Sequence, residues 1–473
     1  MSPKDAPRIG KKKFSMPNAL VLLIILIIIS YIATFIVPSG TFEREYDDLT
    51  GRELVLPGTF SEVDAEPVGI FDLLACIPEG IVGSADIIAL VLIVGGVFGI
   101  INDTGAINAL LGKVIKNMSA KRAYIIIAGI MFVGSLMGYA YGAAELMLPF
   151  IPIAVAACIA MGYDSMTGCA IILLGAGAGF AGTSINPSTA MIAQNIAGLP
   201  VGSGMWFRNI AYAAFLITAI LYIFRYMRKI KKNPQLSPMH EIDKASEYDI
   251  NSSEIPELTG RRKAIVAVFA LGLVAMVVCI VQLGLVVNQI TGFYLIIGLI
   301  CGIIDGQGAE KMTNNFITGA KDMIFSALVI GVARGISVIM TDGMILDTIT
   351  NYAANLVSAL PNAVKAVGMY VFQAFLSIVV PSGSGQATVT MPIMAPLADL
   401  VGMTRQTAVL AYQYGDATIN LITPTSGYFM AAIAMCRIKW GQWFKWFLPL
   451  WLVWALIACT FLVIATQIHL GPF

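Results

Sequence analysis

Residues 182–189 read Gly-Thr-Ser-Ile-Asn-Pro-Ser-Thr, and they interrupt an apolar stretch that runs from 165 to 200. Residues 416–426, Asp-Ala-Thr-Ile-Asn-Leu-Ile-Thr-Pro-Thr-Ser, interrupt the stretch 405–436 in a similar way. Non-helical backbone is tolerated at membrane depth only where protein buries it or where it lines a cavity. The two strings therefore predict two broken membrane helices that meet at a binding cavity.

The rest of the chain has the composition of a membrane protein. Apolar residues make up 58% of its 473 positions, charged residues only 12%, and the mean hydropathy is +0.82. Apolar segments of about 20 residues recur, which is the length that spans a bilayer. The first of them, residues 19–37, is longer than the core of a signal peptide and predicts an uncleaved span. The net charge of +1 predicts no nucleic-acid partner.

Clusters of Lys and Arg predict the cytoplasmic loops, because cytoplasmic loops carry an excess of these residues. The clusters occupy 11–13, 113–122, 225–232 with 261–263, and 437–445. The acidic segment 41–66 has few basic residues and is expected on the outer face. Threading the chain through these markers predicts nine crossings and two re-entrant hairpins, with the N-terminus in the cytoplasm and the C-terminus outside. We expect the inner membrane of a bacterial cell and an all-α polytopic fold.

Internal similarity indicates that the fold consists of two inverted-topology repeats. Gly83-Ser84-Ala85-Asp86 matches Gly319-Ala320-Lys321-Asp322 at an offset of 319 − 83 = 236, which also pairs Gly95 with Gly331 and Gly99 with Gly335. Gly142-x6-Pro149 matches Gly385-x6-Pro392 at an offset of 385 − 142 = 243. Two unrelated strings of membrane helices would be the alternative. The expected organisation is a cytoplasmic tail (1–16), a first repeat (17–228), a flexible cytoplasmic linker (229–260) and a second repeat (261–473).

Two further Gly- and Pro-rich strings, 138–142 and 381–386, are expected at the tips of the re-entrant hairpins. Like the two breaks, they combine freed backbone groups with small polar side chains. Half-helices that begin at Pro187 or Pro424 would point positive dipole ends at a carboxylate. One such string alone would equally suit a kink or a packing contact, but four at symmetric positions favour a site. The candidate substrate-binding residues are Tyr141, Gly142, Glu145, Thr183, Ser184, Asn186, Ser188, Ser382, Ser384, Gln386, Asp416, Thr418, Asn420, Thr423 and Thr425.

The ionisable residues at predicted membrane depth bear on the substrate, because charges there are costly and mark functional sites. Glu145 and Asp416 are acids, and Arg334 is the main deep cation, suited equally to a structural and a substrate contact. Two acids beside helix N-termini favour a zwitterion with an extra positive charge. Either acid could instead take up a proton or a sodium ion. Three other acids, Asp164, Asp305 and Asp399, fall near predicted loop ends, where solvation is expected.

Other classes of function find little support in the sequence. The only histidines, His240 and His469, lie in the linker and the tail, so no enzyme is predicted. No P-loop motif and no repeated filter or ring of like charge is present. The seven cysteines lack metal-ligand spacing, and we expect no metal and no cofactor beyond a coupling ion.

The chain resembles YfcC-type members of the C4-dicarboxylate anaerobic carrier group over residues 15–467. The resemblance rests on Gly142-x2-Glu145-x3-Pro149, on 183–189 and on 416–425. It implies a homodimer with a scaffold and a mobile transport domain that moves as an elevator. The group includes arginine/ornithine antiporters as well as carriers named for C4-dicarboxylates. The two acids favour transport of arginine, ornithine or lysine, by exchange or ion coupling, and dicarboxylate transport is the alternative.

Overall fold

The first half of the chain folds as helices that follow its apolar stretches. It contributes α1 (Ala19–Ile36), α2 (Ile70–Gly83), α3 (Ala85–Asp103), a hairpin of α5 (Ala120–Tyr141), the 3-10 helix η1 (Ala144–Phe150) and α6 (Ile151–Ala160), a broken helix of α7 (Ser165–Gly182) and α8 (Ala190–Ile196), and α9 (Met205–Lys232). The computed structural model describes residues 19–47, 52–65, 67–107, 109–110, 120–142, 144–244, 257–283 and 287–471. The expected tail 1–16 and residues 245–256 of the linker lie outside them.

The second half repeats this order after two additional helices. It contributes α11 (Gly260–Leu283), α12 (Val287–Asp305), α13 (Ala309–Asp322), α14 (Ile324–Asp342), α15 (Leu346–Ser358), a hairpin of α16 (Asn362–Val379) and α17 (Gly383–Leu400), a broken helix of α18 (Arg405–Ile419) and α19 (Gly427–Met435), and α20 (Trp440–Gln467). Corresponding helices match in length: α2 and α13 have 14 residues each, α3 and α14 have 19, and α9 and α20 have 28. This order confirms the prediction of two repeats with hairpins and broken helices.

The two repeats interlock through the glycines that the sequence pairs. A Cβ added to Gly95 of α3 would lie 2.7 Å from the carbonyl oxygen of Gly319 in α13. A Cβ added to Gly80 of α2 would meet the backbone of α14 at Gly331 and Gly335. Only glycine lets two helix backbones approach this closely. The α3–α13 contact and the α2–α14 contact are therefore the same contact seen from each repeat.

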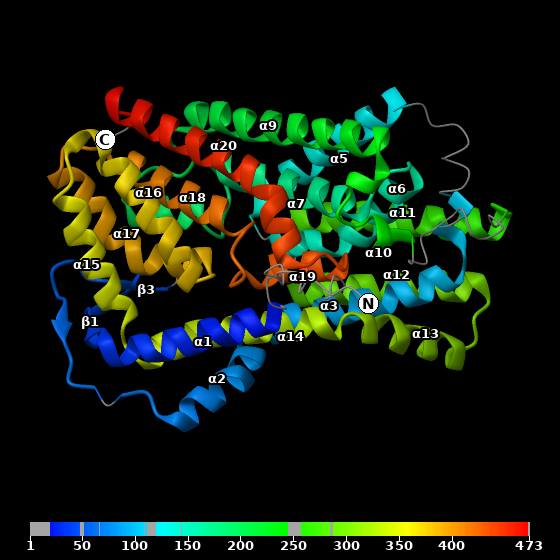
Figure 1. Cartoon of the computed structure of the whole chain (residues 1–473), viewed down its shortest axis with the longest axis horizontal. Coiled ribbons are helices and arrows are strands. Elements are labelled where there is room, and N and C mark those ends of the chain that lie inside the picture. Colours follow the sequence, from blue (N-terminus) through cyan, green and yellow to red (C-terminus); the bar gives the residue numbers. More distant parts are fainter. Residues whose placement is uncertain are drawn as a thin grey trace, which may run out of the picture.

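Seven helices in the described part of the chain are long and apolar enough to cross a membrane. They are α3, α5, α7, α9, α12, α14 and α20. Figure 1 shows the arrangement: α1, α3, α13 and α14 lie along one side, and α9 and α20 lie along the opposite side. The hairpins and broken helices fill the space between, and α14 contacts α19 across it. Polar caps start the two broken helices, where Asp164 accepts from the Thr167 amide at 2.9 Å and Thr404 accepts from the Thr407 amide at 3.3 Å.

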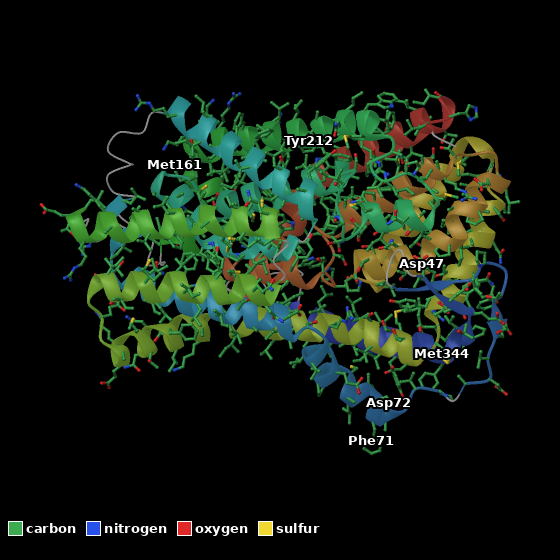
Figure 2. The ribbon with its side chains drawn as sticks, turned by 180° about the vertical axis from the view of Figure 1, so that it is seen from behind. Asp47, Phe71, Asp72, Met161, Tyr212 and Met344 are labelled. Carbon is green, nitrogen blue, oxygen red and sulfur yellow. The ribbon has the colours of Figure 1, made fainter. Side chains whose placement is uncertain are left out.

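The acidic segment contains short strands that the sequence analysis did not predict. Strand β1 (Gly40–Thr41) pairs with β4 (Ser61–Glu62), and β2 (Arg44–Asp47) pairs with β3 (Arg52–Val55), both antiparallel. The segment is fixed to the start of α15 by Asp347, a buried carboxylate that pairs with Arg44 at 2.7 Å and accepts from the Phe42 amide at 3.1 Å. Figure 2 shows Asp47 and Met344, the residue between α14 and α15, at the same end of the molecule.

Two expectations about local structure were wrong, and two helices were missed. Helix α18 continues to Ile419, where the Asp416 carbonyl accepts from the Asn420 amide and Thr418 Oγ1 donates to the Tyr414 carbonyl. The second break therefore covers only 420–426. The half-helices begin at Ala190 and Gly427 rather than at the prolines, since Pro187 and Pro424 lie inside the breaks. Helices α13 and α15 were not predicted, because α13 is too polar for a membrane span and α15 carries a polar face.

The first part of the linker is folded rather than loose. Helix α9 extends through Lys232, and η2 (Pro234–Leu236) and α10 (His240–Lys244) follow it. Asp164 is buried beneath them and accepts from Tyr226 Oη at 2.5 Å and from Ser237 Oγ at 2.6 Å. The expected solvation of Asp164 is thus wrong, because the linker covers it. Asp399 is half exposed and pairs with Arg405 at 2.8 Å, as a residue at a loop end does.

Candidate functional site

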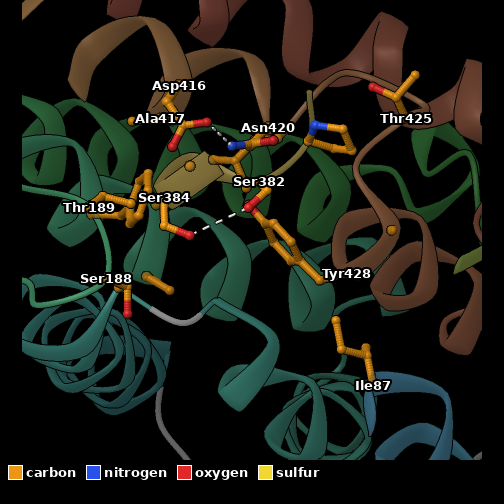
Figure 3. A pocket seen from close by; sticks show the side chains of 18 of the residues that line it. Ile87, Ser188, Thr189, Ser382, Ser384, Asp416, Ala417, Asn420, Thr425 and Tyr428 are labelled. Atoms are coloured by element: carbon orange, nitrogen blue, oxygen red, sulfur yellow. Dashed lines mark hydrogen bonds between the residues drawn. The ribbon is translucent and has the colours of Figure 1, made fainter. Parts of the chain in front are cut away.

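The two hairpin tips and the two helix breaks converge on one cavity of about 240 Å³. The hairpins and broken helices line one side of the cavity with Gly142 at the first tip, Ser188 and Thr189 in the first break, 381–384 at the second tip, and Asn420 and Thr425 in the second break. From the opposite side it is lined by Ser84 and Ile87 at the start of α3 and by Ile330, Ala333 and Arg334 of α14. Figure 3 shows Ser384, Thr189, Asp416 and Asn420 grouped around it. The cavity therefore lies between two sets of helices.

Asp416 is the acid of this cavity. Its side chain is fully buried in α18, and its Oδ1 accepts from Ser377 Oγ at 2.8 Å and from Asn420 Nδ2 at 2.6 Å. Its other oxygen, Oδ2, has no hydrogen-bond partner among the described residues. A buried carboxylate oxygen without a partner is costly, so a cationic group is the ligand that this position suits. Arg334 is the one basic residue among the described residues that line the cavity, and it is half-buried.

Each hairpin tip presses a glycine against the broken helix of its own repeat. Gly142 has φ of 64°, and a Cβ there would overlap the side-chain amide of Asn186. A Cβ on Gly383 would lie 2.7 Å from Asp416 Oδ2 and 2.7 Å from Thr189 Cγ2. Tyr412 fixes the second tip by donating to the Gly383 carbonyl at 2.6 Å. The tips thus cover the breaks, and Gly383 covers the free oxygen of Asp416.

The first break keeps its shape through its own small polar side chains. Thr183 Oγ1 donates to the Tyr139 carbonyl at 2.5 Å and accepts from the Asn186 amide at 3.1 Å. Asn186 Oδ1 in turn accepts from the Ser188 amide at 2.7 Å. In the second break, Thr423 and Thr425 join through their hydroxyls at 2.8 Å. The bonds of Thr183 and Asn186 satisfy backbone groups at the first break, and in the second break the Thr425 amide donates to Thr423 Oγ1 at 3.4 Å. A membrane-buried break requires such partners.

The structure separates the candidate residues into three groups. Those that line the cavity are Gly142, Ser188, Ser382, Ser384, Asp416, Asn420 and Thr425. Those that are buried outside its lining are Thr183, Ser184, Asn186, Gln386, Thr418 and Thr423. The side chains of Tyr141 and Glu145 lie outside the described part of the structure.

The residues outside the lining have structural partners. Gln386 donates to the carbonyl of Gln373 at 2.8 Å and to its side-chain oxygen at 2.6 Å, which joins the two arms of the second hairpin. Thr418 donates to the Tyr414 carbonyl at 2.8 Å within α18. These contacts place both residues behind the cavity wall.

Sequence reasoning missed several residues that matter here. Ser377 lies in an apolar arm of the second hairpin, and only the fold brings it to Asp416. Tyr428 lines the cavity two residues after the second break. Arg208 of α9 is fully buried and donates from Nη1 to the Thr183 carbonyl at 3.0 Å. Its position one turn into a membrane helix was the available signal for this second deep cation.

Comparisons with known proteins identify relatives of this chain. A family model described as "C4-dicarboxylate anaerobic carrier" matches residues 16–467. A protein of Escherichia coli K12 named "Putative basic amino acid antiporter YfcC" is 33% identical and aligns over 92% of this chain and 93% of its own length. An uncharacterized protein of Haemophilus influenzae is 29% identical over 97% of this chain and 98% of its own.

Two solved transporters align over nearly the whole chain. The YdaH transporter of Alcanivorax borkumensis is 17% identical with a TM-score of 0.44, and the alignment covers 96% of this chain and 100% of that one. MtrF of Neisseria gonorrhoeae, described as one of a class of antimetabolite efflux pumps, is 19% identical with a TM-score of 0.39, over 97% and 96% of the two chains.

Proposed function

We propose that this chain, which belongs to the C4-dicarboxylate anaerobic carrier family, moves basic amino acids such as arginine, ornithine or lysine across a membrane. The chain is a membrane transporter and not an enzyme, because its family and its relative in Escherichia coli are named for transport. The observation that supports a cationic substrate is Asp416, a fully buried carboxylate with one oxygen that no described residue satisfies. The name of the relative in Escherichia coli points to the same substrates.

The charges around the cavity also suit an amino acid. Arg334 on α14 and Asp416 on α18 face it from opposite sets of helices. An α-carboxylate at Arg334 and a side-chain cation at Asp416 would leave each buried charge paired. A dicarboxylate would bring two negative charges to a cavity whose described lining has one cation and one anion. Dicarboxylate transport remains the second candidate, since Arg334 and the family's name favour it.

Counterflow distinguishes the two substrates. Purified protein in liposomes loaded with arginine should accumulate labelled arginine, and external ornithine or lysine should compete. Succinate and fumarate should not compete. Exchange of labelled succinate without any exchange of arginine, under imposed sodium, proton and voltage gradients, would replace the first proposal with the second. The same gradients report the coupling ion, for which we propose a proton or sodium.

We also propose an elevator mechanism, in which α5–α9 and α16–α20 move against α1–α3 and α11–α14. The cavity lies between these two sets, so relative movement would carry it from one face to the other. The repeats cross-connect within the second set through α2–α14 and α3–α13, which suits a fixed scaffold.

A disulfide across the moving boundary tests this mechanism. A Cβ on Gly427 of α19 would lie 3.7 Å from Ile330 Cβ of α14, the separation that a disulfide needs. The double variant I330C/G427C, in a background that lacks the seven native cysteines, should lose transport on oxidation and regain it on reduction. The matched single variants I330C and G427C, in the same background, cannot form this disulfide and should stay active on oxidation. Transport that survives formation of the I330C/G427C disulfide would exclude the elevator movement.

The placement in the membrane is part of the proposal. We propose an inner-membrane protein with a cytoplasmic N-terminus and an external C-terminus, which reporter fusions at each end would check. We also propose a homodimer, and Phe71 of α2, which is exposed and projects from the body in Figure 2, is a contact to test by substitution. Light scattering of the detergent-solubilised protein would measure its mass, and a monomer would contradict this part.

A further inference from the structure

The helix that closes each repeat donates a side-chain N–H to the backbone of that repeat's broken helix. Arg208, the fourth residue of α9, donates from Nη1 to the Thr183 carbonyl at 3.0 Å. Trp443, the fourth residue of α20, donates from Nε1 to the Leu421 carbonyl at 2.8 Å. The offset between the two donors, 443 − 208 = 235, equals that between the helix starts, 440 − 205 = 235. The two donors therefore occupy equivalent positions in the inverted repeats.

Both donors bind carbonyls that the end of a helix leaves without an intrahelical partner. Helix α7 ends at Gly182 and helix α18 ends at Ile419, so the Thr183 and Leu421 carbonyls lie just beyond those ends. Trp440 adds a third bond, from Nε1 to the Ile422 carbonyl at 2.9 Å. The last carbonyls of a helix need such donors, most of all where water is excluded. The equivalent bonds hold each break at the point where its backbone turns toward the cavity.

The equivalent positions differ in charge. Arg208 and Trp443 are both fully buried, but only Arg208 brings a positive charge. Arg208 forms no ion pair with a carboxylate in the described part of the chain, and its Nε and Nη2 have no hydrogen-bond partner there. A tryptophan satisfies the carbonyl in the second repeat without the cost of a buried charge. Compared with Trp443, Arg208 therefore adds a buried positive charge to the same hydrogen bond, and such a charge marks a functional position.

We propose that Arg208 is a positioning residue that fixes the first break and gives it positive polarity, whereas Trp443 fixes the second break and leaves it negative. The negative end of α7 is offset by the guanidinium, while the negative end of α18 adds to Asp416. A dipolar substrate in the cavity is thereby oriented with its cation toward Asp416, and its carboxylate is attracted by Arg334 in the lining and by Arg208 behind the first break. The orientation rests on the proposed amino-acid substrate, but the fixing of the breaks does not.

Hydrogen exchange of the full-length protein tests the fixing. R208Q keeps an N–H donor without charge, and R208L removes the donor. R208L should speed exchange of the amides in 183–191 by about 10- to 100-fold, since a charged hydrogen bond is lost, and R208Q should speed it far less. W443F should speed exchange in 420–426 and leave 183–191 unchanged, which serves as the matched control. Unchanged exchange at 183–191 in R208L would overturn the proposal that Arg208 fixes the first break.

Competition between arginine and arginine amide tests the polarity, because the two differ only in the carboxylate. In R208Q the inhibition constant of arginine should rise about tenfold relative to that of the amide, because the positive charge behind the first break no longer attracts the carboxylate. W443F should change both constants by the same factor. Equal changes for both ligands in R208Q would overturn the polarity. If wild-type protein binds neither ligand, the proposed substrate fails, and the exchange experiment still decides whether Arg208 fixes the first break.

Discussion

Replacing Asp416 by Asn removes the charge at the centre of the proposed site and leaves its shape. The side-chain oxygen of Asn can still accept from Ser377 and Asn420, which now meet Asp416 Oδ1 at 2.8 and 2.6 Å. What changes is Oδ2, the oxygen without a described partner. Because Oδ2 has no described partner, one charge-assisted hydrogen bond to a substrate cation is at stake, about 1.5–3 kcal/mol. This corresponds to an increase of about 10- to 150-fold in the dissociation constant of arginine.

The stability of the substrate-free protein should move in the opposite direction. A fully buried carboxylate with an open oxygen costs free energy, and D416N relieves that cost. The melting temperature without substrate should therefore stay the same or rise. Substrate should raise it less than in the wild type, because ligand stabilisation follows affinity.

Thermal-shift titrations with arginine, together with counterflow, measure both effects. S377A is the matched control, since it removes one bond to Asp416 Oδ1 and keeps the charge. It should weaken arginine binding by less than D416N does. An unchanged affinity in a folded D416N protein would show that the substrate does not use this carboxylate. A large fall in stability without substrate would instead assign Asp416 a structural role.

Three further predictions concern the surroundings of the site. G142A should lose transport and about 1–3 kcal/mol of stability, because Gly142 has φ of 64° and a Cβ there would overlap Asn186. The control G58A has φ of 80° but open space around it, and should show in a thermal melt only the backbone cost of about 1 kcal/mol. R44A should lower stability by about 1–2 kcal/mol, since among the described residues it leaves the buried Asp347 with the Phe42 amide as its partner. Limited proteolysis should then cut 40–62 faster, and an unchanged cleavage rate would contradict this anchoring. Burial and the nearby Asp164 raise the pKa of the Asp243 carboxyl above its usual value, so the folded state binds this proton more tightly than the unfolded chain. Stability should therefore fall as pH rises from about 4 through that raised pKa. D243N should flatten this dependence of melting temperature on pH, and an identical dependence in both proteins would refute the assignment.

The sequence predicted those parts of the fold that depend on local composition. Gly and Pro with small polar residues mark backbone that cannot stay helical, which is why the tips near Gly142 and Gly383 and the first break at 183–189 were found. The end of the second break was predicted, but its start was not. Asp416 and Thr418 are compatible with helix and with loop, and only the packing around α18 keeps them helical.

The missed features depend on contacts between distant segments. Helix α13 has a polar sequence, 309–322, and its place in the repeat follows only from its contact with α3 and its match to α2. Asp164 was expected in solvent because it falls near a predicted loop end, yet Tyr226 and Ser237 cover it from 62 and 73 residues away. No local pattern contains such information. The repeat supplies part of it, because each contact in one half predicts an equivalent contact in the other.

The repeat is most informative where its halves differ. Symmetry explains why both breaks need a donor from the closing helix, so Arg208 and Trp443 share a position. It does not explain why one donor is charged, nor why the acid Asp416 stands in the second broken helix while Thr183 and Asn186 shape the first. A symmetric pair of breaks would bind two like groups equally well, as a dicarboxylate presents. A pair with a cation behind one break and an anion beside the other suits a substrate whose two ends differ in charge. The departure from symmetry, rather than the symmetry, is therefore the feature that favours an amino acid over a dicarboxylate.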